Sequence, residues 1–287
     1  MTVSIIAEGL GFPEGPVVMA DGSVIVVELA AGRITRCAKG RTYAVSAIGG
    51  GPNGAAIGPD GALYVCNNGG LDLNRFESAT GPGSEGRIER VDLATGRVDR
   101  VYDQCDGFAL SAPNDLVFDA AGRLWFTDLG KRHGRISEAS GLFCCTPDGR
   151  SITAIHHGAV SYNGVGLSPD GTTVYVADTF QARVYAFDSE VVAQRPRFVG
   201  TVPGPIGLDS LAVTSAGNLC VGTLYHGGIS TVTPAGAVSF RAFDDRYVTN
   251  IAFGGDGWRN AFITLSASGQ LVQTRWDEPG LPLAFSA

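Results

Sequence analysis

The chain has 287 residues, of which 44% are hydrophobic and 17% are charged, and its formal net charge is −7. An acidic chain without a block of basic residues is a poor candidate for binding nucleic acid or an anionic membrane, so we expect neither partner. No apolar run approaches the ~18 residues of a membrane span. The N-terminus also lacks the basic segment of a signal peptide, so we expect a cytoplasmic protein.

Short β-rich runs separated by glycine fill the chain from its beginning. Glycine accounts for 41 of the 287 residues, roughly twice its usual share of ~7%. After a first run at 2–10, similar segments recur six times. They lie at 12–29, 51–68, 112–129, 161–179, 207–224 and 248–265. Each opens with a polar residue, continues with a short apolar run, turns at a glycine and ends in a second β-rich run.

The glycine of each segment predicts a hairpin. It lies eight residues after the polar opener in the first five segments and seven after it in the sixth. Glycine between two apolar runs favours a hairpin because it accepts the positive φ of tight turns. The turns are Asp21-Gly22, Asp60-Gly61, Ala121-Gly122, Asp170-Gly171, Ala216-Gly217 and Asp256-Gly257.

The spacing of the repeats predicts the fold. Successive openers are 39, 61, 49, 46 and 41 residues apart, and a period of about 40–50 residues built from strands is typical of propeller blades. We therefore expect an all-β protein, a single six-bladed β-propeller domain over 1–287 with a metal site in its central channel. Run 2–10 is the candidate strand that closes the ring. The longest gap contains a polar, glycine-rich insertion at 68–86, which could form a lid.

The openers themselves suggest a metal site. They are Glu14, Asn53, Asn114, Asn163, Asp209 and Asn250. The first strand of each blade lines the channel, so the openers should form a ring of two acids and four amides. One such residue alone could simply cap a turn, but the matched position recurs in every segment. An all-oxygen set suits one divalent cation, with Ca²⁺ favoured and Mg²⁺, Mn²⁺ or Zn²⁺ as alternatives.

The motifs "FPEGPV", "PNDLVFDAAGRLWFTD", "YNGVGLSPDGTTVYVAD" and "GLDSLAV" occur in this order. This ordered set resembles the senescence-marker-protein/gluconolactonase family, also called regucalcin-like, over nearly the whole chain. The resemblance implies a six-bladed propeller with one catalytic divalent metal. By motif it makes Glu14, Asn163 and Asp209 metal ligands, and Asn114 a fourth ligand or a close contact to metal and substrate. Asn53, which matches a recurrent channel asparagine, is then expected to contact the substrate or the residues that hold the metal.

The resemblance also implies a reaction. Members of this family commonly hydrolyse sugar lactones, and Asp209 is then the expected base that takes a proton from water. One departure concerns Ser210, which follows Asp209 where the family usually has glycine. That difference could reshape the pocket beside Asp209.

Substrate contacts should lie on the face of the propeller where the openers lie, because the second strand of each hairpin ends on that face. The side chains just beyond those ends are Asn67, Asn68, Lys131 to His133, Phe180, Tyr225 and His226, and Asn74 and Arg75 lie on the insertion. Of these we expect Asn68, Arg75, Tyr225 and His226 to contact a small lactone.

Several alternatives remain open from the sequence. The same ring could serve a phosphotriesterase or another esterase, a lactone isomerase or a carbon–carbon bond hydrolase. A non-enzymatic propeller that binds metal or other proteins is a further alternative, although the three tryptophans form no repeated surface motif. We expect a monomer or a weak homo-oligomer. The six cysteines show no CxxC spacing, so we expect free thiols.

Overall fold

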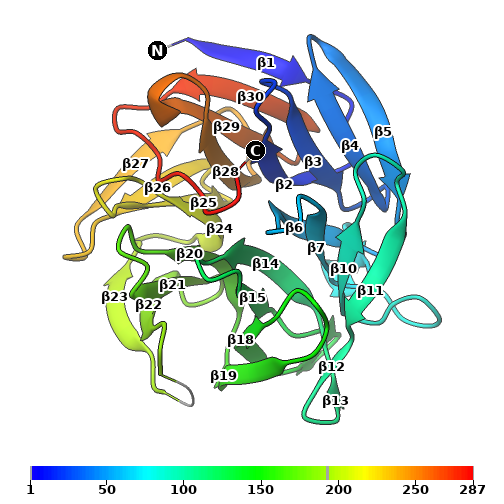
Figure 1. Cartoon of the computed structure of the whole chain (residues 1–287). Helices are drawn as coiled ribbons and strands as arrows, with labels where there is room; N and C mark the ends of the chain where they lie inside the picture. Colours follow the sequence, from blue (N-terminus) through cyan, green and yellow to red (C-terminus); the bar gives the residue numbers. More distant parts are fainter. Residues whose placement is uncertain (1, 192–193, 287) are drawn as a thin grey trace.

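The computed structural model describes residues 2–191 and 194–286. In this part of the chain, six four-stranded antiparallel sheets surround a central axis (Figure 1). No α-helix is present among the described residues, and the single helical turn is a 3-10 turn at Asp256–Trp258. No helix in the described ranges could cross a membrane. The predicted all-β, six-bladed propeller is therefore confirmed.

Each sheet is one blade, and the blades follow one another along the chain. Blade 1 consists of β2 (Pro13–Val18), β3 (Val24–Glu28), β4 (Arg33–Ala38) and β5 (Arg41–Ala47). Blade 2 consists of β6 (Pro52–Ile57), β7 (Leu63–Asn67), β10 (Arg87–Val91) and β11 (Val98–Tyr102). Blade 3 consists of β14 (Pro113–Phe118), β15 (Leu124–Asp128), β18 (Ser140–Cys145) and β19 (Ile152–Ala159). Blade 4 consists of β20 (Tyr162–Leu167), β21 (Thr173–Asp178), β22 (Arg183–Asp188) and β23 (Arg197–Thr201). Blade 5 consists of β24 (Gly207–Val213), β25 (Leu219–Leu224), β26 (Gly228–Val232) and β27 (Val238–Ala242). Blade 6 consists of β28 (Val248–Gly254), β29 (Asn260–Leu265) and β30 (Gln270–Arg275), together with β1 (Val3–Ala7) from the start of the chain.

Three short hairpins stand outside the blades in the described ranges. They are β8 (Leu71–Asp72) with β9 (Glu77–Ser78), β12 (Gln104–Cys105) with β13 (Phe108–Ala109), and β16 (Arg132–His133) with β17 (Ile136–Ser137). The first lies within the predicted insertion 68–86. The hairpin β16–β17 follows the second strand of blade 3 and contacts β9.

Burial follows the position of each strand within its blade. Second strands such as β3 and β7 are buried along their whole length, because neighbouring blades cover both of their faces. Their sequences are accordingly apolar up to the last residue, which is Glu28 in β3 and Asn67 in β7. Outer strands such as β5 are mostly exposed and carry polar residues. The hydrophobic core is divided into clusters that lie between adjacent blades.

The ring closes through strands from both ends of the chain. β1 pairs with β30 in antiparallel register and so completes blade 6 (Figure 1). The first strand of each blade contacts the first strand of the next, and β28 of blade 6 contacts β2 of blade 1. The prediction that run 2–10 supplies the closing strand is confirmed.

The predicted hairpin turns are present in all blades. The glycine of each turn adopts positive φ, between 60° and 83°. All six cysteines are free thiols, as predicted, and five of them are buried.

A β-bulge accompanies each opener. In every blade, the register between the first and second strands shifts at or next to the opener, as between Pro52 and Ala55 around Asn53. A bulge bends its strand and re-aims a side chain. These bulges direct the openers toward the channel.

Candidate active site

Five of the six openers line one cavity of about 130 Å³. They are Glu14, Asn53, Asn114, Asn163 and Asp209. All five side chains are buried, although carboxylates and amides are normally exposed. The repeat therefore brings together residues that lie far apart in the sequence.

The sixth opener, Asn250, lies in a different cavity. Its side-chain Oδ1 accepts a hydrogen bond from the backbone N–H of Ile251 at 2.8 Å. This second cavity, of about 420 Å³, is lined by the continuations of the first strands and by residues 281–284 of the C-terminal segment. Although larger, it contains none of the five converging openers, so the smaller cavity is the candidate active site.

We call the five openers in the smaller cavity its floor. This floor is rich in acceptor atoms that have no hydrogen-bond partner. Four side-chain oxygens of these openers are buried and receive no hydrogen bond: Oε2 of Glu14 and Oδ1 of Asn53, Asn114 and Asn163. Oγ1 of Thr179, which also lines the cavity, is likewise buried and without a partner. Buried polar groups in proteins are nearly always paired, and leaving one unpaired costs about 1–3 kcal/mol. Converging acceptors with no donor among the described residues are what a bound cation requires. The donor set, all oxygen and with two carboxylates, fits a hard divalent ion.

The electrostatics of the floor also indicate a cation site. Burial, followed by the nearby charge of Asp209, raises the pKa of Glu14 well above its ordinary value. Burial likewise raises the pKa of Asp209 to about 7, against a hydrogen bond from Asn163 that lowers it. No salt bridge among the described residues involves either acid. The floor thus holds two carboxyl groups that have no cationic partner among the described residues, and a bound cation would favour their ionised forms.

Glycine after an opener allows the blades to approach closely. A Cβ on Gly15 would lie 2.6 Å from the carbonyl oxygen of Asn53 in the next blade, and one on Gly164 would lie 2.6 Å from that of Asp209. Such distances exclude any side chain. Ser210 takes the corresponding place after Asp209, and its buried Oγ is also without a partner. Ser210 does not line the small cavity.

Aromatic side chains form one wall above the floor. Tyr247 is the centre of the group: its ring centroid lies 6.1 Å from that of Phe12, 5.4 Å from that of Phe76 and 6.1 Å from that of Tyr225. All four line the cavity. We call these four residues the aromatic wall. The Arg132 guanidinium lies 4.6 Å from the ring centroid of Phe180, and both residues also line the cavity.

The insertion 68–86 contributes to this site. Its hairpin β8–β9 supplies Leu71, Phe76 and Ser78 to the lining. The backbone N–H of Arg132 donates to Oγ of Ser78 at 3.1 Å, and that of Gly134 donates to Oε1 of Glu77 at 3.2 Å. These two hydrogen bonds therefore tie the hairpin β8–β9 to the hairpin β16–β17.

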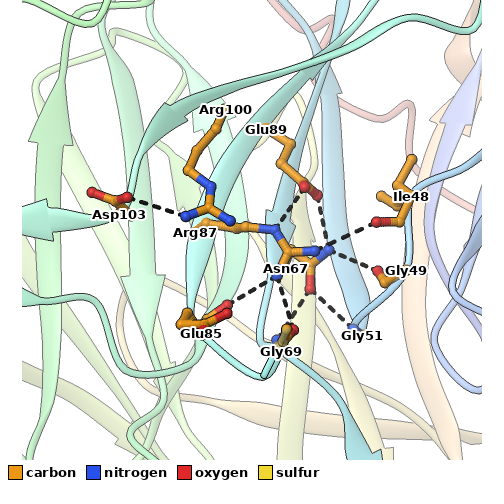
Figure 2. A network of polar contacts seen from close by, with 11 residues as sticks. Ile48, Gly49, Gly51, Asn67, Gly69, Glu85, Arg87, Glu89, Arg100 and Asp103 are labelled. Atoms are coloured by element: carbon orange, nitrogen blue, oxygen red, sulfur yellow. Dashed lines mark hydrogen bonds and ion pairs between the residues drawn. The ribbon is translucent and has the colours of Figure 1, made fainter. Parts of the chain in front are cut away.

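A buried polar network anchors both ends of the insertion (Figure 2). Arg87 Nε donates to Glu89 Oε1 at 2.6 Å, and Arg87 also donates to the carbonyl oxygen of Glu85 at 3.0 Å. Asn67 donates to Glu89 Oε2 at 2.8 Å and accepts from the backbone N–H of Gly69 at 3.0 Å. The network thus holds the chain where it enters and where it leaves the insertion.

The predicted substrate contacts divide into two groups. Asn68 and Tyr225 line the cavity, whereas Arg75 and His226 do not. Arg75 is exposed on the insertion while its neighbour Phe76 faces the cavity. The His226 ring packs against Phe240 of the outer strand β27, with ring centroids 4.9 Å apart.

Sequence reasoning missed Phe12, Phe76 and Tyr247. Phe12 and Tyr247 lie two and three residues before their openers, as Ala112 lies two before Asn114, and all three line the cavity. The repeat could therefore have been used to predict that residues two or three positions before an opener line the cavity. No repeat marks Phe76, because the insertion occurs in one blade.

Comparison with known proteins agrees with the fold and the motifs. The family model described as SMP-30/Gluconolactonase/LRE-like region matches residues 12–267. A gluconolactonase of Zymomonas mobilis is 32% identical over 150 residues, which cover 48% of this chain and 38% of the relative. Lactonase drp35 of Staphylococcus aureus strain MW2 is 29% identical over 185 residues, covering 62% of this chain and 52% of the relative. The aligned part of this chain thus spans about half or less of those relatives.

Solved structures share the fold at lower identity. The gluconolactonase XC5397 of Xanthomonas campestris is 21% identical with a TM-score of 0.77, and the alignment covers 97% of this chain and 89% of that one. Regucalcin of Agrobacterium tumefaciens, described as a calcium-binding protein, is 17% identical with a TM-score of 0.76 and 98% coverage of both chains. Since the family model covers most of the chain in the predicted motif order, the chain belongs to the SMP-30/gluconolactonase/LRE-like family.

Proposed function

We propose that this protein is a hydrolase that opens lactones and depends on one divalent cation. The observation that carries the proposal is the floor of the small cavity, where four unpartnered oxygens and two carboxyl groups converge. The relatives named gluconolactonase and lactonase support a cyclic ester, including the sugar lactones predicted from the sequence, as the substrate. In this proposal Glu14, Asn114, Asn163 and Asp209 hold the cation and Asn53 contacts the substrate.

The chemistry follows from the positions of the carboxyl groups. A bound divalent cation would polarise the lactone carbonyl and stabilise negative charge on its oxygen. Asp209 takes a proton from the attacking water as the new carbon–oxygen bond forms. It then returns that proton to the ring oxygen, which leaves as an alcohol when the ring carbon–oxygen bond breaks. Glu14 stays ionised and balances the charge, and the product is a hydroxy acid.

The donor set favours Ca²⁺ as the cation. Carboxylates and amide oxygens are hard ligands, and Ca²⁺ accepts six to eight of them in flexible geometry. Among the described residues no group of three His, Cys, Asp or Glu side chains forms a metal cluster, so the amides are essential to the proposed site. Zn²⁺, which prefers nitrogen and sulfur ligands, fits this set least well.

The test is hydrolysis of simple δ-lactones, followed by acid release at constant pH. Chelation should abolish turnover, and added Ca²⁺ should restore it. Asp209→Asn should lower kcat by about 10²–10⁴-fold, the usual contribution of a general base. Asp256→Asn, which changes an exposed turn residue, is the matched control and should retain full activity. Full activity of the chelated protein or of Asp209→Asn would overturn the proposal.

A further inference from the structure

The wall of the small cavity contains one buried hydroxyl that the proposed cation site does not use. In five blades the residue directly after the second strand lines this cavity, and these residues are Leu29, Asn68, Leu129, Thr179 and Tyr225. Oδ1 of Asn68 already accepts from the backbone N–H of Gly70 at 2.8 Å, and Tyr225 is 54% exposed. Thr179 is only 5% exposed, and its Oγ1 has no hydrogen-bond partner among the described residues.

Backbone hydrogen bonds place Thr179 beside two floor residues. Its N–H donates to the carbonyl oxygen of Ser161, two residues before Asn163, at 2.9 Å. Its carbonyl oxygen accepts from the N–H of Leu208, the residue before Asp209, at 3.3 Å. Thr179 is therefore held next to the openers of two neighbouring blades, the metal ligand and the base of the proposed reaction.

The side chain of Thr179 has its methyl group against the protein. A Cβ on Gly207 would lie 3.2 Å from Cγ2 of Thr179, so the methyl group faces Gly207. A β-branched side chain has few allowed χ1 rotamers, so the direction of Oγ1 is restricted as well. Buried hydroxyls are nearly always paired. We therefore look for the partner of Oγ1 in a molecule bound in the cavity.

We propose that Thr179 is a further catalytic residue, whose hydroxyl donates a hydrogen bond to the ring oxygen of the lactone. This inference rests on the proposed function. The ring oxygen takes its proton from Asp209 when the ring opens, so it must lie close to Asp209, and Thr179 lies beside that residue. As the ring carbon–oxygen bond breaks, its electron pair moves to the ring oxygen. Thr179 keeps its own proton, and its hydrogen bond strengthens as negative charge develops there.

The experiment compares kcat for two δ-lactones, at saturating Ca²⁺, whose leaving oxygens differ in basicity. δ-Valerolactone releases an aliphatic alcohol, whereas dihydrocoumarin releases a phenol, a much stronger acid that needs less help to leave. Thr179→Val should lower kcat for δ-valerolactone by about 10–100-fold, the effect of losing one hydrogen bond to a charged group, and kcat for dihydrocoumarin by less than about threefold. Thr179→Ser keeps the hydroxyl and should restore most of the activity toward δ-valerolactone.

Thr173→Val is the matched control. Thr173 begins β21, the strand that Thr179 follows, but it does not line the cavity. Both rates should therefore stay at the wild-type level.

Stability and Ca²⁺ affinity provide readouts that do not depend on turnover. Valine replaces an unpartnered buried hydroxyl, so Thr179→Val should leave the Tm unchanged or raise it. Its Ca²⁺ affinity, measured by calorimetry, should equal that of the wild type.

Three results would overturn the inference while leaving lactone hydrolysis intact. They are an equal loss for both lactones, no loss for either, and a weakened Ca²⁺ affinity in Thr179→Val. A lower Tm together with an equal loss would show that the hydroxyl has a structural role instead. A wild type that hydrolyses neither lactone would contradict the proposed function itself.

Discussion

Glu14 and Asp209 are carboxyl groups that folding removes from water, and neither forms a salt bridge with a described residue. Burial raises the pKa of both, in the case of Asp209 to about 7. The folded protein without a cation therefore holds protons that the unfolded chain would release. The proposed cation would replace those protons.

This difference predicts how the stability of the chelated protein depends on pH. Between the ordinary pKa of Asp209, 3.8, and its folded value of about 7, the folded state binds more protons than the unfolded state. The free energy of unfolding must then fall as pH rises through this window. Urea unfolding from about pH 5 to about pH 8 should show the fall. Added Ca²⁺ should flatten the fall, whereas Asp209→Asn should only reduce it, because burial also raises the pKa of Glu14 and raises that of Asp115 to about 7. A chelated wild type that gains stability over this range would contradict the assignment.

At the residue scale the sequence predicted the floor of the site better than its walls. The openers repeat with the blades, so their convergence follows from the fold alone. The aromatic wall could not be predicted in this way, because Phe76 belongs to an insertion with no counterpart in the other blades. Arg75 and Phe76 are adjacent, and only the backbone conformation of the hairpin decides which of them faces the cavity.

At the scale of elements, the insertion 68–86 is held by the buried pair Arg87–Glu89. Both side chains are more than nine-tenths buried, and Arg87 also donates to carbonyl oxygens on the insertion. Removing one member of a buried pair leaves an unpaired charge, whereas replacing both with apolar residues is often neutral. The pair therefore stabilises the fold and also positions the insertion, and variants of the pair can separate these two contributions.

Arg87→Met should destabilise the protein by about 3–5 kcal/mol, because Glu89 is then buried without its cation. The double variant Arg87→Met/Glu89→Leu should recover most of that stability, since no charge remains. It should nevertheless keep a KM for lactones raised several-fold, because the insertion has lost its anchor. Urea unfolding and steady-state kinetics measure the two effects.

Arg100→Met is the matched control for this experiment. Arg100 pairs with Asp103 in the same blade (Figure 2), but both side chains are nearly half exposed. Exposed pairs contribute about 0–1 kcal/mol, so both stability and KM should stay near wild type. A double variant with normal KM would show that the network does not position the insertion.

At the scale of the whole molecule, the ring depends on a strand from the opposite end of the chain. β1 covers β30, which would otherwise be the free edge of blade 6. Unpaired edges are templates for association with other chains. Without β1, blade 6 would have three strands and β30 would be its exposed edge.

Deletion of residues 2–9 should lower the Tm and shift the protein toward larger species in light scattering. Ile5→Lys is the control: the Ile5 side chain is 56% exposed, so the substitution leaves the backbone pairing intact and should change stability by less than about 0.5 kcal/mol. A truncated protein that remains as stable and as monomeric as the wild type would show that β1 does not close the ring.

The global architecture was the most predictable level of this protein. Six matched hairpins with a period of about 40–50 residues are typical of a propeller, in which neighbouring blades bury both faces of second strands such as β3. The bulges beside the openers were not predictable, since they depend on how the first strands pack around the axis. They nevertheless decide where Glu14, Asn163 and Asp209 point.

The most direct test is anomalous diffraction from crystals grown with Mn²⁺, which stands in for Ca²⁺ at oxygen sites. The expected result is one strong peak about 2.0–2.6 Å from oxygens of Glu14, Asn163 and Asp209, with Asn114 also in contact. A crystal that shows no peak among these side chains, or its main peak elsewhere, would contradict the proposed site and the chemistry built on it.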